Sequence, residues 1–203
     1  QKFKGLPART TSRTGFGIAS QVKADMKKIK DYLQLMKPSL SIMVVFSSII
    51  SFLLTQGSEN YVDIWKMIFL LFAGGMLVTG SANAINQVVE KDTDAQMKRT
   101  AKRPVASGRM SVTEGWIFSI VTGALGVFIL GNYFNWLTAG LAAFSLFLYA
   151  FIYTPLKKVN SIAVLVGAVP GALPCLIGWA AGDNNLAIGG WVLFAFQFFW
   201  QFP

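Results

Sequence analysis

The stretch SANAINQVVEKDTDAQMKRTAKRPVASG, from Ser81 to Gly108, decides how this chain is interpreted. It completes a run of 23 residues, 67–89, that carries no charged side chain, and then places three carboxylates and five cations within residues 90–103. A membrane-spanning helix needs about 20 apolar residues, which such a run supplies. The stretch therefore predicts a helix that leaves the membrane at a dense cluster of charged groups.

Three oxygen-bearing side chains in this stretch, Asn86, Glu90 and Asp94, are spaced four residues apart. If the helix continues through Asp94, they share one face. Mg²⁺ prefers oxygen ligands of this kind, and arginine and lysine side chains bind phosphate oxygens. Four cations follow at once: Lys98, Arg99, Lys102 and Arg103. The spacing predicts a magnesium–diphosphate site.

Two further polar residues are expected to support the residues of this site without binding the metal themselves. Asp92 falls off the predicted face, and Asn83 lies one turn deeper in the span, where polar side chains are costly. Structural explanations stay open for the whole cluster. The asparagines could form hydrogen bonds between helices, the carboxylates could belong to a solvated loop, and the cations could only set the topology.

The composition indicates an all-α integral membrane protein. Hydrophobic residues make up 54% of the chain and charged residues 13%, about half of the charged share in ordinary soluble domains. The charge-free run 115–156 is long enough for two helices and contains a polar hinge near Asn132 and Asn135. We expect six membrane spans, at about 38–56, 66–90, 114–131, 136–155, 160–181 and 186–203, the last barely complete.

The basic residues are distributed unevenly along the chain. Of 18 Lys and Arg residues, nine lie in segment 1–37, six in the loop 90–114 and two at positions 157 and 158, whereas only Lys66 falls in a loop on the opposite side. With alternating spans this is a strong positive-inside bias, and it places the N-terminus in the cytoplasm. The net charge of +9 is therefore attributed to topology and phosphate binding, and nucleic-acid binding is not expected.

Segment 1–37 is expected to be a basic cytoplasmic tail, in which residues 18–36 form an amphipathic helix on the inner membrane surface. Cys175 is the single cysteine and the chain contains no histidine. These counts exclude a disulfide framework, a Cys/His zinc site and a histidine general base from this stretch. The ending at Pro203, within or beside an apolar helix, suggests about two-thirds of a longer membrane protein.

The pattern Asn86-x3-Glu90-x3-Asp94, continued by Arg99-Thr100-x2-Arg103-Pro104, resembles the first acidic motif of the intramembrane aromatic prenyltransferases related to 4-hydroxybenzoate polyprenyltransferase. Within that superfamily the chain is most similar to the protohaem IX farnesyltransferase (haem O synthase) family. Three more stretches support the likeness: Leu35-Met36-Lys37-Pro38, Tyr153-Thr154-Pro155-Leu156-Lys157-Lys158 and Trp200-Gln201-Phe202-Pro203. Glu90 departs from the commoner aspartate but still presents a carboxylate.

The resemblance implies nine transmembrane helices around a cavity, with a second acidic motif that would lie beyond Pro203, so that this piece alone would be inactive. It implies that Asn86, Glu90 and Asp94 hold Mg²⁺ against farnesyl diphosphate. Further contacts to the diphosphate would come from five side chains: Lys98, Arg99, Arg103, Tyr153 and Lys157.

The implied reaction is farnesylation of the vinyl group of haem b to make haem O, with loss of diphosphate. Metal and cations would stabilise the departing diphosphate, and the allylic cation would be captured in a water-poor cavity. The implied surroundings are the lipid bilayer of a bacterial inner membrane, or a mitochondrial one, with a haem A synthase acting downstream. Chain-length selectivity and the haem ligand do not follow from the sequence.

Three alternatives belong to other functional classes. Another superfamily member would prenylate a quinone precursor. A transporter or channel for anionic solutes would use Asn86, Glu90 and Asp94 as an ion site and would not consume farnesyl diphosphate. A purely structural assembly subunit would tolerate Asp94→Asn without consequence.

Overall fold

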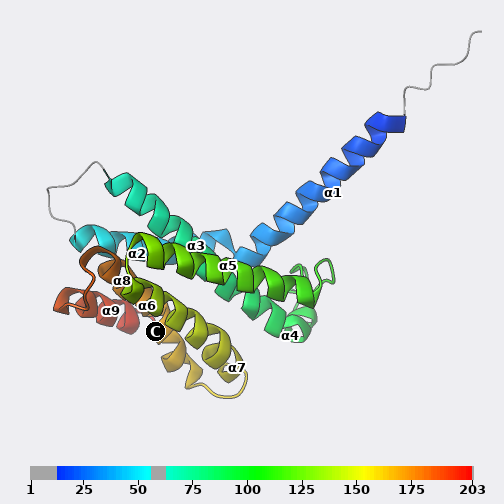
Figure 1. Cartoon of the computed structure of the whole chain (residues 1–203). Helices are drawn as coiled ribbons and strands as arrows, with labels where there is room; N and C mark the ends of the chain where they lie inside the picture. Colours follow the sequence, from blue (N-terminus) through cyan, green and yellow to red (C-terminus); the bar gives the residue numbers. More distant parts are fainter. Residues whose placement is uncertain (1–12, 56–62, 203) are drawn as a thin grey trace, which may run out of the picture.

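The computed structural model describes residues 13–55 and 63–202, and side chains from residue 21 onward; throughout this part of the chain the regular structure is helical (Figure 1). The elements are α1 (Arg13–Met36), α2 (Pro38–Thr55), α3 (Ile64–Val89), α4 (Lys91–Gln96), α5 (Val112–Tyr133), α6 (Trp136–Phe147), the π-helix η1 (Leu148–Tyr153), α7 (Thr154–Leu156), α8 (Ala163–Asp183) and α9 (Ile188–Trp200). The prediction of an all-α fold is confirmed.

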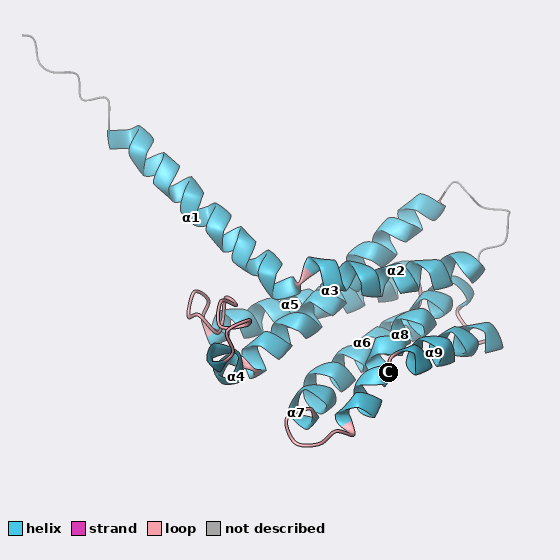
Figure 2. Cartoon of the chain, turned by 180° about the vertical axis from the view of Figure 1, so that it is seen from behind, coloured by secondary structure: helices cyan, strands magenta, loops and turns pink. Residues whose placement is uncertain are grey.

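Five helical segments form a closed ring. In order around the ring, α2 packs on α3, α3 on α5, α5 on α6, α6 on α8, and α8 on α2 again. Helix α9 packs on the outside of α8 (Figures 1 and 2). The ring encloses the space in which the cavity described below is found.

Among the described residues, five segments are long and apolar enough to cross a membrane: α2, α3, α5, α8 and the continuous stretch Trp136–Leu156. The chain is therefore a multi-pass membrane protein. The sixth expected span, 186–203, coincides with α9, whose 13 residues fall short of the roughly 20 that a span needs. Segment 115–156 divides between Tyr133 and Trp136, where Asn135 caps α6 by accepting a hydrogen bond from the Thr138 amide.

Helix α3 does not continue to Asp94, as a single face for the three oxygen-bearing side chains would require. It ends at Val89, and Glu90 separates it from the six-residue helix α4. Residues 90–94 carry four charges and cannot extend an apolar span, so the chain turns there. Backbone hydrogen bonds from the Glu90 amide to Asn86 and from the Asp94 amide to Glu90 keep the turn compact.

Helix α1 leaves the bundle and projects away from it (Figure 1), but its last turns contact the end of α3 and the start of α5. Leu35 is fully buried with Ala84, Val88, Val105 and Met110. Polar contacts reinforce this packing, since Arg109 pairs with Asp31 at 2.9 Å and the Tyr32 hydroxyl donates to Glu114 at 2.6 Å. Whether the rest of α1 lies on a membrane surface remains a prediction.

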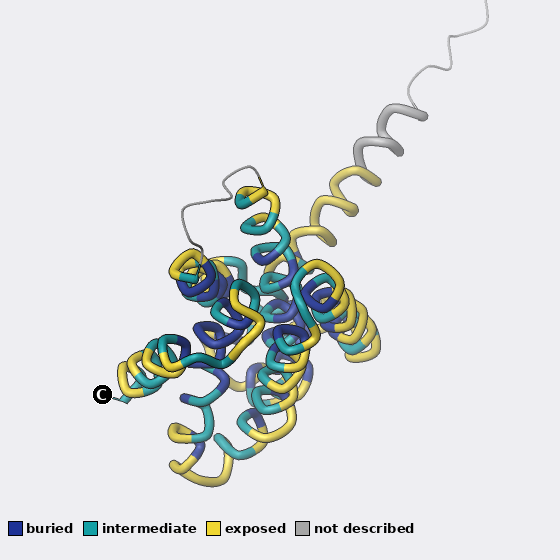
Figure 3. Tube along the Cα trace, turned by 60° about the vertical axis from the view of Figure 1, so that its left-hand side comes forward, coloured by how far each residue is buried: buried dark blue, intermediate teal, exposed yellow. Residues whose placement is uncertain are grey.

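The burial of side chains matches the arrangement of the helices in a ring. Buried residues face its interior and exposed residues form its outer surface (Figure 3). Many exposed side chains on the outer face are large and apolar, among them Phe69, Phe128, Phe196 and Phe199. A soluble protein rarely presents so much apolar surface, whereas a lipid-facing surface requires it.

Candidate functional site

The loops after α4 and α7 and the start of α5 gather at one end of the bundle, here called the charged end (Figure 2). The last turn of α3 meets α7 there. Lys157 Nζ donates to Asn86 Oδ1 at 2.7 Å and lies 3.0 Å from Glu90 Oε1. Asn86 Nδ2 in turn donates to Glu90 Oε2 at 2.9 Å, and the buried Thr154 hydroxyl donates to Asn86 Oδ1 at 3.3 Å. The structure thus joins Asn86, Glu90 and Lys157 in one contact network.

Asp94 belongs to a second pair beside this network. Its side chain is almost fully buried and its Oδ2 lies 2.6 Å from Arg103 Nη1. Thr100 is also buried, and its hydroxyl donates to the main-chain oxygen of Asp94 at 3.0 Å. The loop after α4 therefore folds back on itself and presents the Arg103 guanidinium beside the Asp94 carboxylate.

Lys37 is a member of the charged end that the sequence analysis did not single out as a site residue. It lies between α1 and α2, is half-buried, and has a left-handed backbone conformation with φ of 50°. Burial, together with repulsion from Arg103 and Lys157, lowers the pKa of its ammonium group to about 8, against attraction from Asp94 and Glu90. Lys37 therefore shares the electrostatic field of both ion pairs, and three cations face two carboxylates.

Asn83, expected to support the site, fixes the backbone beside Lys37. Its Nδ2 donates to the Met36 carbonyl and to Ser41 Oγ, each at 3.2 Å. Gln87, which the sequence analysis passed over, donates to the Leu35 carbonyl at 2.9 Å. The end of a helix leaves four carbonyls without helical partners, so these two amides cap α1 from within α3.

The remaining predicted residues lie farther out. Lys98, Arg99 and Asp92 are exposed, and their side chains form no ion pair or hydrogen bond with any other residue that the structure describes. Lys102 is exposed as well, and its carbonyl accepts from Arg109. These side chains are free to meet a ligand arriving from outside the charged end.

Tyr153 connects the charged end with the interior of the ring. It closes the π-helix η1, and Lys157 Nζ lies 5.2 Å above the centre of its ring. Single π-helical turns inside α-helices occur frequently at functional sites. A side chain at Gly167 would bring a Cβ to 2.5 Å from the Tyr153 ring, so this ring lies directly on the backbone of α8. The Tyr149 ring packs beside it at 5.2 Å between centroids.

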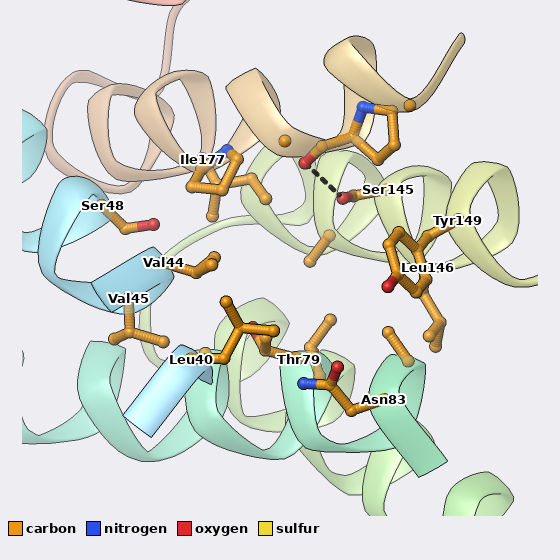
Figure 4. Close-up of a pocket in the computed structure, with 18 of the residues that line it drawn as sticks. Leu40, Val44, Val45, Ser48, Thr79, Asn83, Ser145, Leu146, Tyr149 and Ile177 are labelled. Carbon is orange, nitrogen blue, oxygen red and sulfur yellow. Dashed lines mark hydrogen bonds between the residues drawn. The ribbon is translucent and has the colours of Figure 1, made fainter. Parts of the chain in front are cut away.

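A mostly apolar cavity of about 430 Å³ occupies the centre of the ring, within the usual range of small-molecule sites. Side chains of α2, α3, α6 and α8 line it, including Val44, Thr79, Leu146 and Ile177 (Figure 4). Tyr149, Tyr153 and Asn83 line its wall as well. The contact network of Asn86, Glu90 and Lys157 is here called the charged network. Because Tyr153 also contacts Lys157, the apolar cavity and the charged network share a boundary.

The donor set fits Mg²⁺ in kind. Asn86, Glu90 and Asp94 offer only oxygen ligands, and Mg²⁺ is usually bound by one or two carboxylates together with substrate phosphates and water. Within residues 13–55 and 63–202 no three His, Cys, Asp or Glu side chains cluster closely enough to hold a metal by themselves. A bound phosphate would add further oxygen ligands to those of the described residues.

Comparison with known proteins identifies the family. The model of the UbiA prenyltransferase family matches residues 22–203. The chain belongs to this family. It is 45% identical over 173 residues to the protoheme IX farnesyltransferase of Flavobacterium johnsoniae, covering 85% of this chain and 57% of that relative. It is 41% identical over 194 residues to the mitochondrial protoheme IX farnesyltransferase of Arabidopsis thaliana, covering 96% and 44% respectively.

Solved structures of this prenyltransferase family share the fold. A digeranylgeranylglyceryl phosphate synthase matches with a TM-score of 0.73 at 22% identity, over 85% of this chain and 59% of that one. A UbiA homolog from Archaeoglobus fulgidus, bound to GPP and Mg²⁺, matches with a TM-score of 0.67 at 16% identity, over 84% and 59%. The chain thus spans well under two-thirds of the proteins that it resembles.

Proposed function

We propose that the protein transfers the farnesyl group of farnesyl diphosphate to the vinyl group of haem b, making haem O and releasing diphosphate. The observation that carries this proposal is the boundary at Tyr153, where an apolar cavity meets a cluster of oxygen ligands and cations. A molecule with an apolar tail and a diphosphate head needs both environments side by side. The identity to protoheme IX farnesyltransferases supports haem as the acceptor.

Lys157, Arg103 and Lys37 are the cations placed to hold the diphosphate, with Lys98 and Arg99 reaching it from the exposed loop. Asn86, Glu90 and Asp94 would hold Mg²⁺, as oxygen ligands of this kind suit it, and a UbiA homolog has been solved with Mg²⁺ bound. When bound, the metal supplies positive charge that stabilises the departing diphosphate.

In this reaction the bond between farnesyl C1 and the diphosphate oxygen breaks, and the electron pair leaves with the diphosphate. The three cations stabilise that developing charge. The rings of Tyr149 and Tyr153 lie beside the place where the allylic cation forms and can stabilise it through their π-faces. The haem vinyl group then attacks C1, and water adds to the resulting cation and gives up a proton.

The charged end lies on the cytoplasmic side of a bacterial inner membrane in this proposal, or on the equivalent side of the mitochondrial inner membrane. The distribution of basic residues supports this orientation. Haem O, as the product, would be the substrate of a haem A synthase.

The test is production of haem O by the full-length protein in membranes. Membranes receive haem b and farnesyl diphosphate, with Mg²⁺ or with EDTA, and the extracted haems are analysed by mass spectrometry. We expect a mass gain of one hydrated farnesyl group, dependent on Mg²⁺ and absent in Glu90→Gln. Prenylation of an aromatic acid instead of haem would support a quinone-forming enzyme, and farnesyl diphosphate left intact would support the transporter alternative.

A further inference from the structure

A second hollow lies beside the charged network, between the end of α7 and the start of α8. It has a volume of about 360 Å³ and is lined by Tyr153 and by side chains of the segment 157–164. This hollow is here called the turn pocket. It shares two lining residues, Tyr153 and Val164, with the central cavity. The two spaces are therefore neighbours, with the Tyr153 ring at their common wall.

The charge of the turn pocket is exclusively positive. Lys157 and Lys158 line it, together with Asn160 and Ser161, and no carboxylate does. The four ion pairs between described residues involve Lys28, Lys157, Arg103 and Arg109. Lys158 is not among them, and within the described part of the chain its ammonium group makes only a long contact of 3.4 Å with the Val89 carbonyl. A pocket with an uncompensated lysine favours an anion.

The surroundings of the turn pocket are apolar and exposed. Val159 is 85% exposed, and Ile162 and Val164 are each more than half exposed. These residues lie where the chain enters a membrane span, so their side chains face lipid or the interface. A ligand with a phosphate head and an apolar tail satisfies both features, because basic pockets at the membrane surface suit such headgroups.

We propose that the turn pocket binds the phosphate head of an amphipathic lipid, and that Tyr153 separates this second site from the central cavity. The shared chemistry is a phosphate ester with an apolar tail. One source of this group is farnesyl diphosphate, an identification that rests on the proposed function. In that case the substrate binds first in the turn pocket and then passes Tyr153 into the cavity. An anionic phospholipid is the other source of the same group.

The experiment compares Lys158→Gln with Lys30→Gln in the full-length protein, reconstituted in phosphatidylcholine nanodiscs. Lys30 is exposed on α1, so Lys30→Gln removes the same charge at a position outside both sites. Stopped-flow tryptophan fluorescence measures the association rate of farnesyl diphosphate. We expect about a fivefold slower association for Lys158→Gln, because removing a charge at the rim of a site mainly lowers the association rate of a charged ligand. Turnover of Lys158→Gln at saturating substrate should stay unchanged. Lys30→Gln should change neither the association rate nor the turnover.

Val164→Phe fills the wall between the two spaces without changing the charge, and it should slow association in the same way.

A second arm adds phosphatidylglycerol and counts retained lipids by native mass spectrometry. Loss of a phosphatidylglycerol in Lys158→Gln, without a change in farnesyl diphosphate association, would support the pocket with a phospholipid as its occupant. Unchanged association and unchanged lipid retention in both variants would overturn the proposal. If the wild-type protein makes haem O while Lys158→Gln changes neither association nor lipid retention, this inference alone is overturned. If the wild-type protein binds no farnesyl diphosphate, the proposed function is overturned too.

Discussion

Lys157, just after α7, pairs with Glu90, at the end of α3, with 3.0 Å between Nζ and Oε1. Both side chains are largely buried, at 25% and 13% exposure. A diphosphate would compete with Glu90 for the ammonium group, and Mg²⁺ would compete with Lys157 for the carboxylate. A magnesium diphosphate offers new partners to both residues at once, so the pair can open without leaving a buried charge alone.

Glu90→Gln should abolish most activity while the protein stays folded. The amide keeps the shape of the side chain but loses the charge that binds metal and Lys157. We expect a fall in kcat of at least about 100-fold, as for other groups that stabilise developing charge. Glu90→Asp preserves the carboxylate and should retain much more activity. Haem O formation by membranes with each variant provides the measurement, and equal activity of Gln and Asp variants would argue against a metal ligand at this position.

Asp94→Asn should weaken the use of Mg²⁺ and also destabilise the loop after α4. The buried guanidinium of Arg103 would lose its partner at 2.6 Å, which costs about 3 kcal/mol for a buried pair and less where water reaches it. Titration of activity with Mg²⁺ should show a half-saturating concentration raised about tenfold. Asp31→Asn is the matched control, because it breaks the ion pair with Arg109 away from the oxygen ligands. It should lower thermal stability but leave the Mg²⁺ titration unchanged.

The sequence predicted the helical membrane fold because charge-free runs are long and their boundaries are sharp. It also predicted that Asn86 and Glu90 lie together, since residues four apart on a helix are neighbours. It did not show that the chain turns at Glu90, so that Asp94 faces Arg103 instead of extending the same face. The turn depends on where the membrane ends, which residue spacing within one helix does not encode.

Residue patterns could not predict the contacts between segments that are distant in the sequence. Lys157 reaches Asn86 across 71 positions, and only the family resemblance pointed to it. Lys37 was missed although a signal existed. It is the last charged residue before an apolar span and directly precedes Pro38, and a residue before proline disfavours the helical region. A charged residue at such a forced helix boundary is a good candidate for a position fixed by function.

Gly167→Ala should disturb the site through Tyr153 alone. The new methyl group would meet the Tyr153 ring at 2.5 Å, so the ring must move away from α8 and from Lys157. We expect a drop in kcat/KM of about tenfold or more, since small misplacements of binding groups are costly. Gly140→Ala is the control, because nothing lies within 4 Å of its added Cβ and alanine favours a helix interior. If both variants were equally active, the position of Tyr153 would not matter for the reaction.

The affinity for farnesyl diphosphate should fall as the pH rises from 7 to 9. The pKa of Lys37 is lowered from 10.5 to about 8 by burial and by Arg103 and Lys157, against Asp94 and Glu90. Below pH 8 the ammonium group is charged and attracts the diphosphate, whereas above pH 8 it loses its proton. The phosphate groups stay ionised over this range, because their last pKa is about 6. The dissociation constant measured in nanodiscs should therefore rise across pH 8.

Two substitutions separate the charge of Lys37 from its backbone conformation. Lys37→Gly removes the ammonium group but adopts a φ of 50° without strain, so the protein should fold normally, bind more weakly at pH 7 and lose the change in affinity near pH 8. Lys37→Arg keeps its charge throughout the range and should bind well at pH 9. Because bound diphosphate favours the protonated form of Lys37, the wild-type protein should also take up protons on binding near pH 8, which calorimetry in buffers of different ionisation enthalpy can detect. A pH profile of Lys37→Gly identical to that of the wild type would place the titrating group elsewhere.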